Sequence, residues 1–151
     1  KAGKPASAGP FYLVWENPAA SKVRIEEWPF QLAGFTISAS LEKEFPATVP
    51  DPKLAANSTV RRGYALFAQN CFACHTMNGQ GHSQLGPDLN IPFSPTEYFK
   101  PSALRTQIRN PQKLHRWPQS KMMGFEPAAL SDKEISEIIA YLSHMSRRKV
   151  P

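Results

Sequence analysis

Two cysteines and a histidine stand within five consecutive positions of this 151-residue chain, as Cys71-Phe72-Ala73-Cys74-His75. A Cys-x-x-Cys-His sequence is the attachment signature of a c-type haem. Thiols at this spacing reach the two vinyl groups of one porphyrin, and the adjoining imidazole can bind the iron from one face. The sequence therefore predicts one haem c, bound covalently through Cys71 and Cys74, with His75 as an iron ligand.

Two other chemistries use a Cys-x-x-Cys pair. Structural zinc takes four ligands, and the chain has no second cysteine pair to complete such a site. A redox-active dithiol needs a cysteine of lowered pKa and is expected beside a βαβ pattern, which this sequence lacks. Haem attachment is therefore the interpretation that the residues favour, and the dithiol or a structural disulfide is the main alternative.

The length and the composition indicate one domain with an appendage. Residues 1–58 are rich in Pro and aromatic side chains, and we expect an extended N-terminal arm there, with a mobile tail at residues 1–9. Its strand-like runs are residues 11–15 and 30–37. The arm is too apolar for a free linker and too short for its own core, so we expect it to pack on the haem domain or on a partner protein.

Residues 59–151 have the pattern of helices joined by loops and are expected to form the haem domain. Helices are predicted over residues 60–70 and 102–109, and a third is predicted to begin at the capping box Ser131-x-x-Glu134. The buried face of this third helix is predicted to comprise Ile135, Ile138, Ile139, Leu142 and Met145.

The net charge is +6, and the excess of basic side chains lies entirely in residues 59–151. One stretch without any acid holds six bases, which are Lys100, Arg105, Arg109, Lys113, Arg116 and Lys121. No nucleic-acid-binding motif accompanies them, so nucleic acid is not an expected partner. The bases form either a solvated face, contacts to haem propionates, or a docking surface for an acidic redox partner.

No stretch approaches the roughly 20 apolar residues of a membrane-spanning helix. The N-terminus also lacks the apolar core of a signal peptide. Haem c is attached outside the bacterial cytoplasm or in an equivalent compartment, because attachment needs two free thiols and delivered haem. We therefore expect a periplasmic protein without a membrane span, whose export signal has been removed.

An electron-transfer haem usually has two strong axial ligands, and a Met opposite the His raises the reduction potential. Two candidates for the second ligand follow the attachment motif too closely to cross to the other face of the ring easily, and two belong to the third helix. Met122 and Met123 lie in a Pro- and Gly-flanked loop, residues 118–124, that can bring a thioether to that face. The full set of candidates is Met77, His82, His115, Met122, Met123, His144 and Met145.

Six short motifs follow one another along residues 59–146. They are Gly63-x-x-x-Phe67, Cys71-x-x-Cys74-His75, Gly86-Pro87-x-Leu89, Ile108-Arg109-x-Pro111, Lys121-Met122-x-x-Phe125, and Leu130-Ser131-Asp132 followed by Ala140-Tyr141-Leu142. This order resembles that of class I monohaem cytochromes c of the bacterial periplasmic type. The resemblance implies a mainly α fold of that class around one covalently bound haem.

The resemblance also implies the distal ligand. In the family this loop typically reads Lys-Met-Pro-x-Phe, with the Met before the Pro as the iron ligand. That alignment selects Met122 and places Met123 where the Pro would stand, which leaves Met123 as the alternative. Phe125 and Leu89 are then expected to wall the haem.

Further residue roles follow from the same resemblance. The carbonyl of Pro87 is expected to accept a hydrogen bond from His75, which fixes the tautomer of the ligand. Arg109 and Trp117 are candidates for the haem propionates, because a guanidinium and an indole both donate hydrogen bonds. The first and last helices are expected to cross where Gly63 and Phe67 meet Tyr141 and Leu142.

These features favour one-electron transfer, with no catalytic residue and no enzymatic activity of the protein itself. The alternative is a five-coordinate haem that binds a small gas or peroxide. Residues 9–15 and 28–32 resemble a segment of sulfite-oxidase-like molybdopterin oxidoreductases, which suggests a periplasmic dehydrogenase of that type as the electron donor. A free monomer that passes electrons to a terminal oxidase is the alternative partnership.

Overall fold

The chain divides into two compact units, Lys1–Ser38 and Ala39–Pro151. The sequence-based division instead placed the boundary after residue 58. The predicted mobile tail lies outside the residues that the structure describes. The computed structural model describes residues 11, 13–21, 32–35, 37, 39–83 and 85–150.

The first unit contains one short helix in its described part, α1 (Pro18–Ser21), whose Ala20 N–H donates to Asn17 Oδ1 at 3.1 Å. The described residues of the two strand-like runs form no strand. Between the described residues of the two runs, the Leu32 N–H donates to the Phe11 carbonyl at 3.1 Å.

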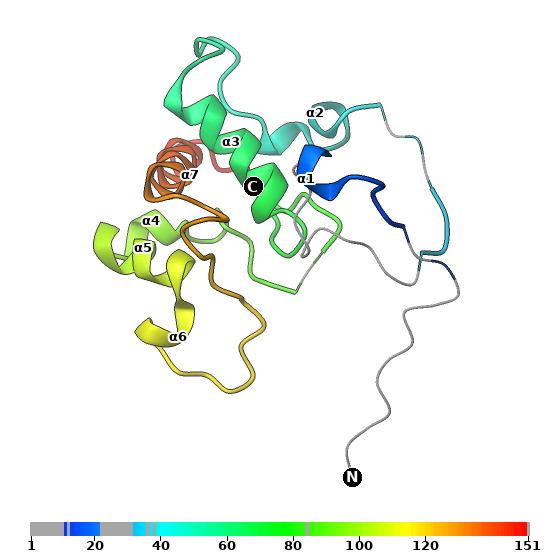
Figure 1. Ribbon diagram of the computed structural model, residues 1–151. Coiled ribbons are helices and arrows are strands. Elements are labelled where there is room, and N and C mark those ends of the chain that lie inside the picture. The colour runs from blue at the N-terminus through cyan, green and yellow to red at the C-terminus, as the bar shows by residue number, and fades with distance from the viewer. Residues whose placement is uncertain are drawn as a thin grey trace. The chain divides into compact units, whose positions relative to one another are not determined.

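The second unit consists of helices joined by loops (Figure 1). The predicted helices are confirmed as α3, α5 and α7, and their ends lie within one or two residues of the predicted ones. The other helices are single turns, which are too short to show a hydrophobic period. In chain order the elements are α2 (Leu41–Glu44), the 3-10 helix η2 (Pro46–Thr48), α3 (Thr59–Asn70), α4 (Pro95–Tyr98), α5 (Pro101–Arg109), α6 (Pro111–Leu114) and α7 (Asp132–Met145).

The capping box predicted for α7 is present. Ser131 Oγ accepts from the Glu134 N–H at 3.3 Å, and Glu134 Oε2 accepts from the Ser131 N–H at 2.7 Å. These two bonds satisfy backbone donors that a helix start would otherwise leave without a partner. The predicted inner face is confirmed, since four of its residues are buried and Ile139 is partly buried against the same core.

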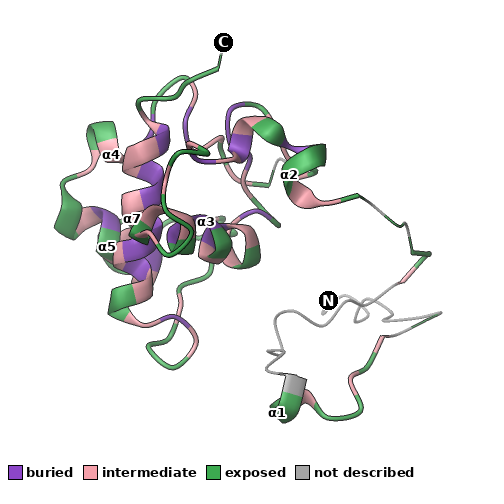
Figure 2. Cartoon of the chain, turned by 90° about the horizontal axis from the view of Figure 1, so that it is seen from above, coloured by how far each residue is buried: buried purple, intermediate pink, exposed green. Residues whose placement is uncertain are grey.

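Helices α3 and α7 cross at close range, and their facing surfaces are the most buried part of this unit (Figure 2). A side chain at Gly63 would overlap the backbone carbonyl of Glu137, so the crossing requires a residue without a Cβ. One turn further along α3, the rings of Phe67 and Tyr141 lie with centroids 5.1 Å apart, and both are fully buried. The expected contact between the first and last predicted helices is therefore confirmed.

Residues 39–58 belong to the same unit as the helices. The Phe45 ring is buried edge-on against Phe72, with centroids 5.1 Å apart. The Tyr141 hydroxyl donates to the Thr48 carbonyl at 2.6 Å inside the core. This segment has no helical period in its sequence, but its aromatic ring and its carbonyls complete the core, which is why the structure places the boundary near residue 38.

Candidate haem site

The haem-attachment motif continues the last turn of α3. The Cys71 N–H donates to the Phe67 carbonyl at 2.8 Å, and the N–H groups of Cys74 and His75 both donate to the Cys71 carbonyl, at 3.0 and 2.9 Å. This tight turn holds the two thiols and the imidazole together on one short stretch of backbone. The two cysteines form no disulfide.

The surroundings of the cysteines do not suit the alternative chemistries. Burial, together with the nearby charge of Cys74, raises the pKa of Cys71 to about 12. A redox-active dithiol needs a lowered thiol pKa, so Cys71 lacks that activation. Within the described residues, no three His, Cys, Asp or Glu side chains gather around a point where a metal ion could bind, and zinc needs four ligands.

His75 is held in one orientation. Its Nδ1 lies 2.8 Å from the Pro87 carbonyl oxygen, and because a carbonyl only accepts, Nδ1 carries the proton. In the neutral ring with this tautomer, Nε2 has the lone pair that a metal-binding imidazole requires. Gly86 also lies against the ring, and a Cβ there would be 2.6 Å from Nδ1. The hydrogen bond implied by the resemblance is therefore present, and Gly86 makes room for it.

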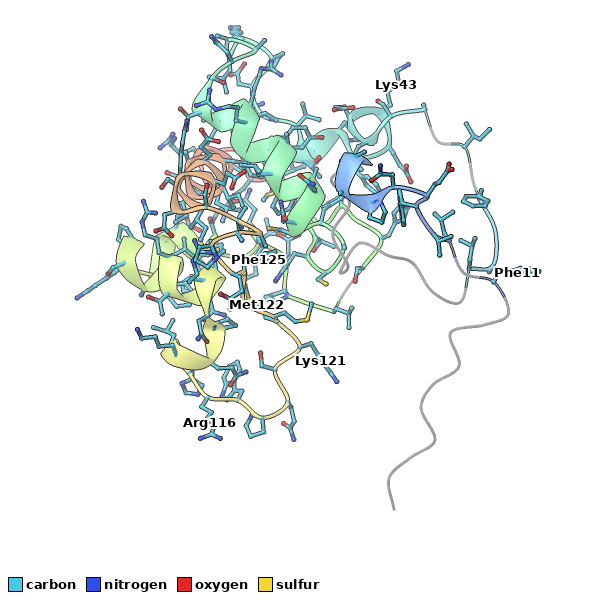
Figure 3. All side chains as sticks on the ribbon, in the orientation of Figure 1. Phe11, Lys43, Arg116, Lys121, Met122 and Phe125 are labelled. Carbon is cyan, nitrogen blue, oxygen red and sulfur yellow. The ribbon has the colours of Figure 1, made fainter. Side chains whose placement is uncertain are left out.

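Met122 and Met123 have opposite environments. Met122 is half-buried, and its sulfur accepts a hydrogen bond from Gln107 Nε2 at 3.4 Å. The side chain of Met123 is 68% exposed. Figure 3 shows Met122 near the helices, whereas Lys121 lies on the outer part of the loop.

The two residues expected to wall the haem are both half-buried against the core. The N–H of Leu89 donates to the Thr76 carbonyl at 2.9 Å, which ties the segment after His75 back to the attachment motif. The N–H of Phe125 donates to the Arg109 carbonyl at 3.2 Å. These bonds hold Leu89 just beyond the segment that carries His75, and Phe125 just beyond Met122.

The two candidates for the propionates differ from expectation in their surroundings. The Arg109 guanidinium donates to the carbonyls of Phe125 and Leu130, at 2.5 and 2.6 Å, and to Asp132 Oδ1 at 2.6 Å. The N–H groups expected to bind a propionate are therefore already hydrogen-bonded to acceptors of the protein itself. Trp117 is 64% exposed, and its ring meets His115 edge-on.

Sequence reasoning did not single out three residues that shape this site. Gly86 belongs to the Gly-Pro-x-Leu motif, but the motif does not show that the missing Cβ makes room for the His75 ring. Gly124 lies where a side chain would overlap the Arg109 carbonyl. Gln107 carries no sequence signal at all, because an amide on a helix is usually solvated. Only the folded loop shows which atom it contacts.

The residues present fit a covalently bound haem. Two thiols and an imidazole whose Nδ1 is hydrogen-bonded to Pro87 lie on one turn of backbone, and a half-buried thioether lies on a separate loop. Cys71 and Cys74 would form the thioether bonds, and His75 would bind the iron. Bound haem would supply an iron that cycles between the ferric and ferrous states.

Comparison with protein families agrees with this geometry. The family model described as Cytochrome c matches residues 60–146. The chain therefore belongs to the cytochrome c family, whose members carry a covalent c-type haem and transfer electrons through it. No curated protein and no solved structure gives a match to this chain.

Proposed function

We propose that this protein is a class I, bacterial-type one-electron carrier whose haem iron is bound by His75 and Met122. The observation that carries the proposal is the contrast within the loop, where the Met122 sulfur is turned inward and the Met123 side chain is 68% exposed. The resemblance of the loop to Lys-Met-Pro-x-Phe supports the same residue.

Both proposed ligands come from segments that the protein holds firmly. His75 is hydrogen-bonded to Pro87, and the Met122 loop is attached to α5 through Phe125 and Arg109. Ligands that stay bound in both oxidation states keep the reorganisation of the site small, which suits electron transfer. They also leave no open position for a substrate, so we do not propose an enzymatic activity.

Single methionine substitutions test this ligation. In the ferric wild-type protein we expect the weak sulfur-to-iron charge-transfer band, and we expect Met122→Ala to abolish it. Met123→Ala is the matched control and should keep the band. Loss of the band only in Met123→Ala would contradict the assignment.

The other candidate function, a five-coordinate haem that binds a gas or peroxide, has a separate test. Carbon monoxide is added to the reduced wild-type protein and to Met122→Ala. We expect slow or negligible binding by the wild type, and rapid binding once the Met122 thioether is removed. Rapid, tight binding by the wild type would favour the five-coordinate alternative.

We further propose an acidic redox partner, namely a periplasmic dehydrogenase of the molybdopterin type to which this chain serves as the electron-accepting subunit. Lys113, Arg116 and Lys121 are exposed next to the exposed side chains of Trp117 and Met123. A cationic surface with an apolar centre suits an acidic partner, because charge speeds the encounter and apolar contact stabilises it. The resemblance of residues 9–15 and 28–32 supports a donor of this type.

The proposed cationic docking surface predicts how charge-reversing substitutions change the rate at which such a dehydrogenase reduces the protein. Replacing Lys113, Arg116 and Lys121 together by Glu should slow reduction and reverse its dependence on ionic strength. Lys53→Glu is the control, because this exposed lysine lies outside the basic stretch. Equal rates for the triple variant and the control would contradict this docking surface, and co-purification with the dehydrogenase would identify the complex directly.

We propose the periplasm as the location, on the chemistry of haem attachment. Among the residues that the structure describes, no helix has the length and apolar character to cross a membrane. Fractionation of cells that express the full-length protein tests the location, and haem-bound protein in the cytoplasmic fraction would contradict it.

A further inference from the structure

Gln107 lies on α5, and its side-chain amide points to the loop that carries the proposed distal ligand. Its Nε2 is 3.4 Å from the Met122 sulfur, and both side chains are half-buried. An amide nitrogen is a donor only, and a thioether sulfur has two lone pairs. The sulfur can therefore accept this hydrogen bond and bind a metal ion at the same time.

The backbone next to this contact is fixed. At the end of α5, the backbone carbonyl of Arg109 accepts a hydrogen bond from the Phe125 N–H at 3.2 Å. The Arg109 guanidinium donates to the Phe125 carbonyl at 2.5 Å. A side chain at Gly124 would overlap the Arg109 carbonyl, so the loop lies directly against the helix end there. Gln107 is two positions upstream on the same helix, and Met122 is three positions upstream of Phe125. The Gln107–Met122 contact thus lies beside a closely packed attachment point.

We propose that Gln107 positions the sulfur of Met122 as the distal ligand and raises the reduction potential of the haem by donating a hydrogen bond to that sulfur. The inference rests on the proposed His75 and Met122 ligation. A hydrogen bond donated to the sulfur draws electron density away from it. This weakens the bond of the sulfur to ferric iron more than its bond to ferrous iron, and the reduction potential rises. Hydrogen bonds to a ligand are one of the means by which a protein tunes a haem.

The contact also gives the chain a means of choosing between adjacent methionines. Gln107 reaches Met122 on the inner side of the loop, whereas Met123 is turned to the solvent. Without the proline that follows the ligand in related loops, the amide supplies a restraint on the sulfur itself. Gln107 is therefore a positioning residue, and its effect is exerted through Met122.

The test measures the reduction potential of the full-length, haem-bound protein. Gln107→Leu removes the donor, and Gln119→Leu makes the same replacement at an exposed position of the loop. We expect Gln107→Leu to keep the sulfur-to-iron band and to have a lower potential than both the wild type and Gln119→Leu. A potential equal to that of Gln119→Leu would overturn the proposal.

Leucine could also loosen the loop, so a second variant preserves the length of the side chain. Gln107→Glu has no donor when ionised and regains one, an O–H, when protonated. We expect its potential to lie below the wild type at neutral pH and to rise toward it as the carboxyl is protonated. A potential that equals the wild-type value at both pH values would overturn the proposal, even if Gln107→Leu had lost its ligand.

Failure of this inference is distinguishable from failure of the ligation. If the wild type shows no sulfur-to-iron band, or if Met122→Ala keeps the band, the proposed ligation is wrong and the inference falls with it. If the band depends on Met122 while the potentials of the Gln107 variants do not move, the ligation stands and only the role of Gln107 is wrong.

Discussion

The Nδ1 atom of His75 donates a hydrogen bond to the carbonyl oxygen of Pro87 at 2.8 Å. Gly86, the residue before that proline, donates its own N–H to the Cys74 carbonyl at 2.8 Å. The segment that receives the imidazole is thus tied to the attachment motif from which the imidazole projects. The orientation of His75 is therefore set by one segment of backbone, in which Pro87 accepts its hydrogen bond and Gly86 lies against its ring.

Gly86→Ala should disturb this arrangement. The added Cβ would lie 2.6 Å from His75 Nδ1, so the ring must turn away from Pro87. Loss of a hydrogen bond that orients a metal ligand typically costs about 10- to 100-fold in metal affinity or activity. We expect a roughly tenfold lower yield of haem-bound protein, measured by haem content and the absorption spectrum. Gly34→Ala is the control, because its Cβ would meet nothing within 4 Å, and equal yields for the two variants would contradict the packing argument.

Gly63→Ala should destabilise the crossing of α3 and α7. The new Cβ would overlap the Glu137 carbonyl, and backbone cannot move aside as a flexible side chain can. Overpacking of this kind costs about 1–3 kcal/mol or more. We expect the free energy of unfolding in guanidinium chloride to fall by at least about 2 kcal/mol. Ala65→Ser changes an exposed position of the same helix and should stay within about 0.5 kcal/mol of the wild type.

Two N-terminal truncations should differ in their effect on the stability of the haem domain. Removal of residues 1–38 deletes only the first unit and keeps every contact within Ala39–Pro151, so it should lower the unfolding free energy of the haem domain less than the longer truncation does. Removal of residues 1–58 also deletes Phe45 and the Thr48 carbonyl that accepts from Tyr141. Because loss of one buried Phe side chain alone costs about 3–5 kcal/mol, the longer truncation should cost at least about 3 kcal/mol. Equal stability of the two proteins in denaturant titrations would contradict the boundary near residue 38.

His144 should make stability depend on pH. Its Nε2 accepts from the Asp51 N–H at 3.1 Å, which requires the neutral ring. Burial, with the charges of Arg148 and Arg147, holds the pKa of His144 below its ordinary value of 6.5, and the Asp51 carboxylate partly opposes them. The unfolded chain then binds the proton first as the pH falls. The stabilisation by His144 is therefore complete above about pH 6.5 and is lost as the pH falls toward the folded pKa.

The check compares unfolding free energies at about pH 7.5 and about pH 5.5 in His144→Gln and in the wild type. We expect the wild type to lose more stability than His144→Gln between the two values, because the glutamine binds no proton. His115→Gln replaces an exposed histidine and should behave like the wild type. A steeper loss in His144→Gln than in the wild type would show that the sign is wrong.

The features that could be predicted from the sequence are those that depend on residues close together in the chain. The motif at Cys71 to His75 determines a turn of adjacent residues, and the long helices show a hydrophobic period, so both are readable without a structure. The single-turn helices and residues 39–58 show no period. Their places depend on distant partners, as when Thr48 accepts from Tyr141. Such pairs leave no trace in local spacing.

The roles of polar side chains were less predictable than the fold. The sequence shows that Arg109 is a forked donor, and the family order suggests a propionate as its acceptor. In the structure the fork is occupied by the carbonyls of Phe125 and Leu130 and by Asp132. Gln107 shows the same limit, because the chemistry of an amide does not say which atom it will meet.

The hydrogen bonds from Tyr141 to Thr48 and from Asp51 to His144 each join positions 93 residues apart. Contacts of such long sequence separation form late, because a large loop must close first. The turn from Phe67 to His75, by contrast, needs only its own neighbours. We therefore expect the attachment motif to take its local shape early during synthesis, and residues 39–58 to find their place in the core only after α7 has been made.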